Sequence, residues 1–144
     1  MKLVFFDPQT TDNPHKRTNT LNPTLLTGGI AIVIALIFYT TAVWSERFAG
    51  RLKGWHLALF WTGLVFDTTG TLLMTEISGG FSLDVHAVTG AAAILLMLGH
   101  TVWASIVLAA RQEKAIRNFH KFSLLVWLAW LVPFINGLGY GMGR

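Results

Sequence analysis

The sequence predicts an all-α integral membrane protein, a four-helix up-down bundle that forms one domain. Three observations favour this fold class. Of the 144 residues, 53% are hydrophobic and only 12% are charged, whereas a typical soluble domain is about 25% charged. The chain holds four apolar stretches, each near the length of about 20 residues that a membrane-spanning helix needs. It has no Cys, which excludes disulfides, thiolate nucleophiles and iron–sulfur clusters.

The elements follow one another in a simple order. Residues 1–23 are polar and include three prolines, so we expect a tail packed on the surface of the bundle and no signal peptide. Residues 24–144 form the membrane domain. Charged residues or turn residues bound each predicted helix. The spans are expected at about residues 24–44, 54–74, 83–110 and 119–138.

Lys and Arg are unevenly distributed between the two ends of this predicted bundle. Two short loops at one end hold seven of the 11 basic residues, and the other four are spread along the rest of the chain. The positive-inside rule therefore predicts cytoplasmic basic loops and both termini outside, in a multi-pass protein of the cell (inner) membrane. The net charge of +4 then reports orientation in lipid and does not indicate nucleic-acid binding.

Four of the five histidines lie within or at the ends of these spans: His56, His86, His100 and His120. An ionisable side chain in hydrocarbon is costly and therefore indicates a functional site. Imidazole is also the usual axial ligand of b-type haem iron. We therefore expect these histidines to ligate one or two haem b groups. The alternative for each is a hydrogen-bonded packing residue, and zinc or copper is less favoured without a close cluster of His and carboxylate.

The spacing of the histidines separates two levels. His86 and His100 share one helix face but lie about 21 Å apart along the axis, too far to ligate one iron. Helix rise places His100 with His56 and His120 near the cytoplasmic side, where two of the three would hold a haem. His86 is alone near the outer side. A site there would take a substrate or a second haem, either five-coordinate or completed by His15.

Two glycines lie on the same helix faces as these histidines. Gly63 follows His56 by seven residues, and Gly90 follows His86 by four. Small residues at these positions leave room for a flat macrocycle, so both are candidate cofactor-binding residues. Close packing by a neighbouring helix would also explain Gly63.

Two carboxylates are candidate catalytic residues. Asp67 is the only acid deep in a predicted span. It is a candidate proton relay or hydrogen-bond partner of a ligating imidazole, and the alternative is a protonated acid satisfied by threonines or by a neighbouring helix. Glu76 lies near the outer loop and would deliver protons there, although such residues are more often solvated loop charges.

Five segments resemble the HsmA family of small bacterial membrane proteins: residues 44–47, 52–61, 66–71, 86–90 and 118–123. The resemblance implies four membrane helices and bound haem, and it assigns no reaction. The layout is also similar to the b-type cytochromes built as four-helix membrane bundles, some of which move electrons between quinones and oxygen species. This chain departs from their two matched histidine pairs, because only His86 lies at the outer level of the spans.

The leading hypothesis is therefore a membrane haem-dependent oxidoreductase. It would move electrons from membrane quinol or another donor to a small oxidant such as peroxide or superoxide. Two alternatives belong to other classes: a non-enzymatic haem carrier or sensor, and a structural small subunit of a larger complex. A homo-oligomer is compatible with each of them.

Overall fold

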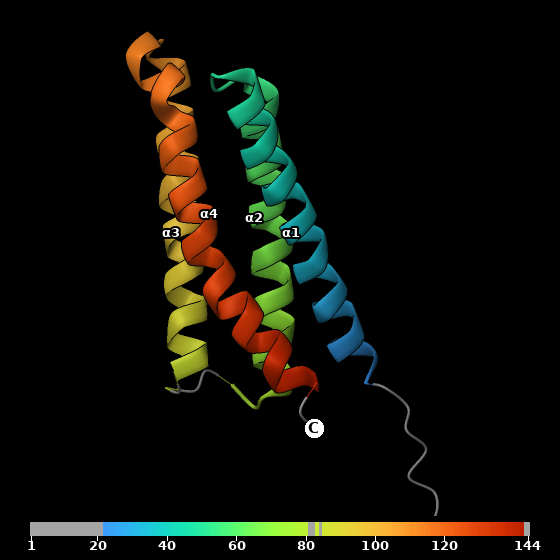
Figure 1. Cartoon of the computed structure of the whole chain (residues 1–144). Helices are drawn as coiled ribbons and strands as arrows, with labels where there is room; N and C mark the ends of the chain where they lie inside the picture. Colours follow the sequence, from blue (N-terminus) through green and yellow to red (C-terminus); the bar gives the residue numbers. More distant parts are fainter. Residues whose placement is uncertain (1–21, 81–82, 84, 143–144) are drawn as a thin grey trace, which may run out of the picture.

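The computed structural model of the chain consists of four long helices (Figure 1). It describes residues 22–80, 83 and 85–142, with side chains described up to Gly139. Most of the predicted tail, including His15, lies outside the described residues. The helices are α1 (Pro23–Ala49), α2 (Gly54–Ile77), α3 (Val85–Ala109) and α4 (Glu113–Met142).

Each helix is long and apolar enough to cross a membrane. Large apolar side chains cover the outside of all four, and examples are Ile37, Val65, Leu95 and Leu125, which are 58–68% exposed. Lipid tails are as apolar as these side chains, so the outer surface suits a bilayer and not water. The coarse prediction of an all-helical chain with four candidate membrane spans is confirmed.

Helices α1, α2 and α4 are longer than the apolar stretches that predicted them, whereas α3 is slightly shorter than its predicted span. α1 ends at Ala49, five residues beyond the predicted span, and α4 begins at Glu113, six residues before it. Hydropathy misses these turns because they are amphipathic: Glu46 and Ile116 are buried, while Arg47 and Arg117 on the same turns are exposed.

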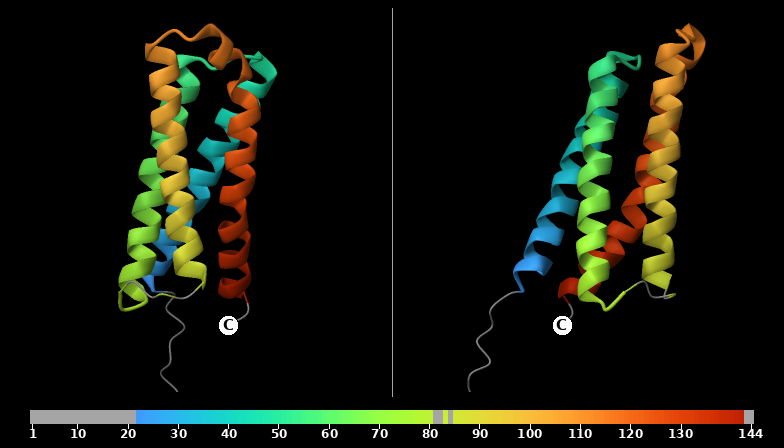
Figure 2. Two further views of the ribbon diagram at one scale, coloured as in Figure 1. Left: turned by 90° about the vertical axis from the view of Figure 1, so that its left-hand side faces the viewer. Right: turned by 180° about the vertical axis from the view of Figure 1, so that it is seen from behind.

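The four helices form two hairpins. α1 packs mainly against α2, and α3 mainly against α4. The α1–α2 and α3–α4 connections lie at one end of the molecule, and the last turns of α2 and α4 lie at the other (Figures 1 and 2). Every Lys and Arg of the described residues lies at or near the two connections, so we call this the basic end: Arg47, Arg51, Lys53, Arg111, Lys114, Arg117 and Lys121.

Glycines allow α1 and α2 to approach closely. A Cβ added at Gly70 would lie 2.6 Å from Ile32 Cγ1 and 2.9 Å from the carbonyl oxygen of Gly28. A Cβ added at Gly63 would lie 2.6 Å from Cε1 of Tyr39. The close approach of Tyr39 thus accounts for a glycine at Gly63 by helix packing, and the predicted role of Gly63 in cofactor binding stays a prediction.

We expect Gly70→Ala to destabilise the protein by about 1–3 kcal/mol, the usual cost of overpacking. The backbone of α1 is the obstacle, and it cannot rotate away as a flexible side chain could. Gly99→Ala is the matched control, because a Cβ there would meet nothing within 4 Å; it should be neutral or stabilise the helix by about 0.5–1 kcal/mol. Thermal unfolding in detergent, followed by circular dichroism, measures both, and equal melting temperatures would contradict the packing argument.

Candidate functional site

A buried chain of three polar side chains joins the two hairpins near the basic end. Ser123 Oγ in α4 donates a hydrogen bond to Glu46 Oε2 in α1 at 2.7 Å. Nε2 of His100 in α3 lies 2.9 Å from the same Ser123 Oγ. Glu46 and Ser123 are fully buried, and His100 is 2% exposed. A serine hydroxyl carries one hydrogen, so Ser123 accepts from His100, whose Nε2 is protonated and whose Nδ1 is a bare acceptor.

This chain also fixes the relative height of the hairpins. Ser123 lies ten residues from the beginning of α4, while Glu46 lies three residues from the end of α1. α4 therefore begins about 10 Å beyond the end of α1, and Figure 2 shows the α3–α4 connection farther out than the α1–α2 connection. Two contacts brace the offset: the Leu52 amide donates to the Ile116 carbonyl at 3.0 Å, and Arg51 lies 3.5 Å from Glu113.

Each helix contributes one buried side-chain atom without a hydrogen-bond partner toward the basic end. Among the described residues these atoms are Glu46 Oε1, His56 Nε2, His100 Nδ1 and His120 Nδ1. We call them the four unpartnered atoms. Native proteins leave few buried polar atoms unpaired, so a set of four with one from each helix calls for a functional explanation.

Three phenyl rings surround the His100 imidazole. The ring of Phe60 meets it edge-on at 4.6 Å between centroids. Phe119 and Phe122 lie at 5.2 and 5.7 Å. These rings keep water away from the imidazole, and they fill the space beside it in this structure.

A second polar cluster surrounds Asp67. Trp130 Nε1 donates to Asp67 Oδ2 at 2.8 Å, and the Tyr39 hydroxyl donates to the same oxygen at 3.4 Å. The Tyr39 and Trp130 rings also pack edge to face at 5.1 Å. Asp67 is only 3% exposed. Tyr39 and Trp130 belong to neighbouring helices, so contacts between helices hold the buried Asp67 carboxyl group.

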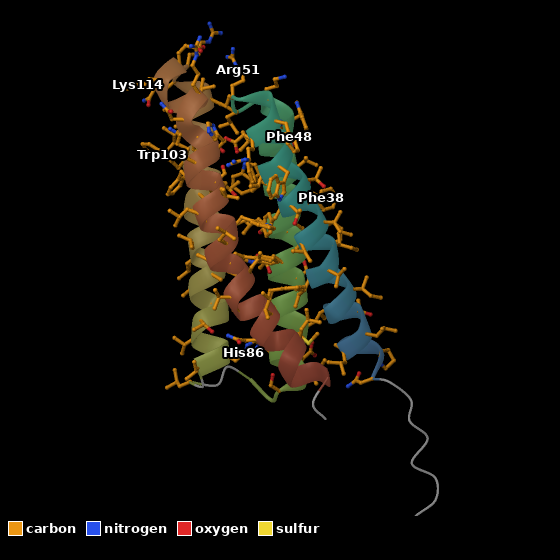
Figure 3. All side chains as sticks on the ribbon, viewed as in Figure 1. Phe38, Phe48, Arg51, His86, Trp103 and Lys114 are labelled. Atoms are coloured by element: carbon orange, nitrogen blue, oxygen red, sulfur yellow. The ribbon has the colours of Figure 1, made fainter. Side chains whose placement is uncertain are left out.

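The two clusters belong to one repeating pattern. Residues that are seven positions apart on each helix form three layers. The first layer consists of Glu46, Phe60, His100 and Ser123. The second consists of Tyr39, Asp67, Ala93 and Trp130, and the third of Ile32, Met74, His86 and Gly137. Seven residues are two helical turns, so successive layers are about 10 Å apart. We call them the Glu46, Asp67 and His86 layers. The last lies farthest from the basic end, where Figure 3 shows His86 at the far end of α3.

The Glu46 and Asp67 layers are separated by apolar side chains. Ala42, Val43, Leu64, Met97 and Val126 are buried at the intermediate turns. Each carboxylate is therefore held in its own polar cluster, and apolar packing insulates it from the other. This arrangement fixes the vertical register of the helices, because a slip of one turn would place a carboxylate against hydrocarbon.

The remaining predicted site residues are placed as follows. His56 is buried at the beginning of α2, and its Nδ1 accepts a hydrogen bond from the Lys53 amide at 3.0 Å. His120 is half-buried in α4. A Cβ added at Gly90 would meet nothing within 4 Å. Glu76 is exposed near the end of α2. The structure brings His100 together with Ser123 and Glu46, and the described residues contain no group of three or more His, Asp and Glu that could hold a metal ion by themselves.

Sequence reasoning did not single out Glu46, Ser123 or Tyr39 as site residues. Glu46 follows the apolar stretch of α1, in a turn that hydropathy assigns to the loop. The signal that could have found it is periodicity, because Glu46 lies seven residues after Tyr39 on the face that begins at Ala35 and Tyr39, both fully buried. The heptad positions of α4 lead in the same way from Trp130 back to Ser123.

A comparison of the chain with family models, curated proteins and solved structures gives no significant match. The resemblance to the HsmA family and to b-type cytochromes is thus neither supported nor refuted, and it stays a prediction.

We expect Ser123→Ala to lower the free energy of unfolding by about 1–3 kcal/mol, because Glu46 and the His100 N–H both lose a buried partner. Thr69→Val is the control, since the Thr69 hydroxyl donates to the Val65 carbonyl of its own helix; it should change stability by less than about 0.5 kcal/mol. Denaturation of the detergent-solubilised protein measures both. Equal stabilities of the two variants would show that the buried chain does not hold the hairpins together.

Proposed function

We propose that this protein is a four-helix up-down membrane bundle that binds haem b and transfers electrons. The basic end lies in the cytoplasm and the termini lie outside, as the positive-inside rule predicts for this distribution of Lys and Arg. The electron donor is membrane quinol, and the acceptor is a small oxidant such as peroxide or superoxide. The four unpartnered atoms carry the proposal, because three of them are imidazole nitrogens that lie toward the basic end.

Two imidazoles near the basic end are the candidate ligands of a haem iron. His100 offers a bare Nδ1, while its Nε2–H is held by Ser123 and, through it, by the Glu46 carboxylate. Metal-bound imidazoles are typically supported in this way, with the second ring nitrogen donating toward a carboxylate or another acceptor. His120 presents the other buried nitrogen, Nδ1, and is the second candidate ligand.

His56 has a different role in this proposal. Because its Nδ1 accepts the Lys53 amide hydrogen, the neutral ring carries its proton on Nε2 and cannot ligate through that atom. The buried Nε2–H is instead a donor that can hold an oxygen of the cofactor or of a small oxidant. The three histidines of the basic end are thus divided between ligation and hydrogen bonding.

Haem, when bound, supplies one-electron chemistry that no side chain of this Cys-free chain provides. The protein contributes orientation and exclusion of water. The phenyl rings around His100 exclude water, and they must move aside to admit a macrocycle, so binding separates the hairpins locally. Asp67, held by Trp130 and Tyr39, is the candidate store for a proton between the two ends, and exposed Glu76 is the candidate exchange group with solvent.

An oxidised and dithionite-reduced visible spectrum of the detergent-purified protein, with a pyridine haemochrome count, tests the proposal. The protein, expressed with ample haem, should show a Soret band and sharp reduced α bands. His100→Ala should lose the haem of the basic end. His56→Ala should retain it with an altered response to peroxide, and Ser123→Ala should weaken haem affinity by about 10–100-fold.

The same preparations separate the alternatives. A carrier would release its haem when apomyoglobin is added to the purified protein, whereas an electron-transfer protein would retain its haem. A structural subunit would be colourless, and its histidines would tolerate alanine without a change in any spectrum. A colourless wild-type protein would overturn the haem proposal.

A further inference from the structure

The His86 layer surrounds a cavity that the haem site does not use. Its volume is about 610 Å³, within the range of roughly 300–1,000 Å³ that small-molecule sites occupy. α1 and α4 form most of its wall, Met74 of α2 and His86 of α3 complete it, and its other lining residues are all apolar or glycine. The cavity therefore offers one imidazole in otherwise apolar surroundings.

The cavity is accessible from the side of the bundle. Leu25, Leu26 and Ile30 on α1 and Leu138 on α4 line it, and each is also 44–53% exposed on the outer surface. In a membrane these side chains would contact lipid, so the cavity is open to a molecule that dissolves in the bilayer. This access favours a lipid-soluble occupant.

The position of the imidazole indicates a ligand with a hydrogen-bonding oxygen. His86 packs over Gly137, where an added Cβ would lie 3.0 Å from its Cε1, so the glycine makes room for the ring. An imidazole can donate to a carbonyl and accept from a hydroxyl. The His86 imidazole therefore suits a ligand oxygen that accepts a hydrogen bond when the ligand is oxidised and donates one when the ligand is reduced. A saturated acyl chain has no group that could form a hydrogen bond with the imidazole.

We propose that this cavity binds the ring of a lipid-soluble quinone, with His86 hydrogen-bonded to one ring oxygen. The inference rests on the proposed redox function, and it identifies the cavity as the binding site of the electron donor. Phe134 lines the cavity and stacks on Trp130 at 5.5 Å between centroids. Trp130 in turn donates to Asp67, so the quinone site adjoins the Asp67 layer through an aromatic pair.

Photolabelling of the full chain in phosphatidylcholine nanodiscs with an azidoquinone tests the site. We expect the label to map to the α1 and α4 residues of the cavity wall, and excess decylubiquinone to suppress it. Decanol, a ring-free chain of the same length, should not compete. Gly29→Leu, which extends a side chain into the cavity, and His86→Leu, which removes the hydrogen bond, should each reduce labelling at least fivefold.

Gly99→Leu is the matched control for Gly29→Leu. Gly99 lies outside the cavity lining, and a Cβ added there would meet nothing within 4 Å, so labelling should be unchanged. Wild-type labelling in both Gly29→Leu and His86→Leu, or equal competition by decanol, would overturn the quinone site and identify a lipid crevice. Because labelling requires no haem, a haem count on the same samples tests the proposed function separately: label without haem contradicts the redox function, and haem without label contradicts only this site.

Discussion

The hydrogen bond between Ser123 and Glu46 connects the two hairpins where both residues are excluded from water. A carboxylate in such surroundings is stable only with hydrogen-bond partners, because neither lipid nor the apolar core can replace water around it. The position of Ser123 therefore dictates the height of α4 relative to α1, and His100, on the other side of Ser123, is fixed by the same atom. In a membrane, apolar contacts alone would not favour one helix register over another, so the hydrogen bonds that link Glu46, Ser123 and His100 would specify the register.

The Asp67 cluster, two helical turns away, also holds a buried carboxyl group by hydrogen bonds between helices, but with other donors. Its donors are the indole of Trp130 and the phenol of Tyr39, large rings that also fill the core. Tyr39 lies against Gly63, so the close approach of α1 and α2 and the burial of Asp67 depend on the same pair of residues. An apolar layer separates this cluster from Glu46. Transfer of a proton between the two carboxylates therefore requires a motion or an inserted water, which makes the layer a natural point of control.

Composition and hydropathy were sufficient to predict four helices, since a bilayer demands long apolar spans of any chain that crosses it. They could not place the ends of α1 and α4, because amphipathic turns at the interface score as loops. The histidine spacing predicts that His86 and His100 share one helix face, but it could not show that Ser123 holds His100. That partner depends on how the two hairpins are aligned, a tertiary property that no single helix encodes. The contact between the Lys53 amide and His56 is local, because it closes the first turn of α2. The sequence also left two explanations of Gly63 open, and the tight contact with Tyr39 favours helix packing.

The two ends of the bundle differ in which side chains line the interior. Near the basic end the interior is polar and closed, with three histidines and a carboxylate beneath a surface rich in Lys and Arg. Around His86 the interior is apolar and reached from the lipid. The Asp67 layer lies between these two regions, about 10 Å from each. Heptad spacing of the core residues therefore places two polar clusters and one apolar cavity along the same bundle. The proposed redox function would use this difference between the two ends.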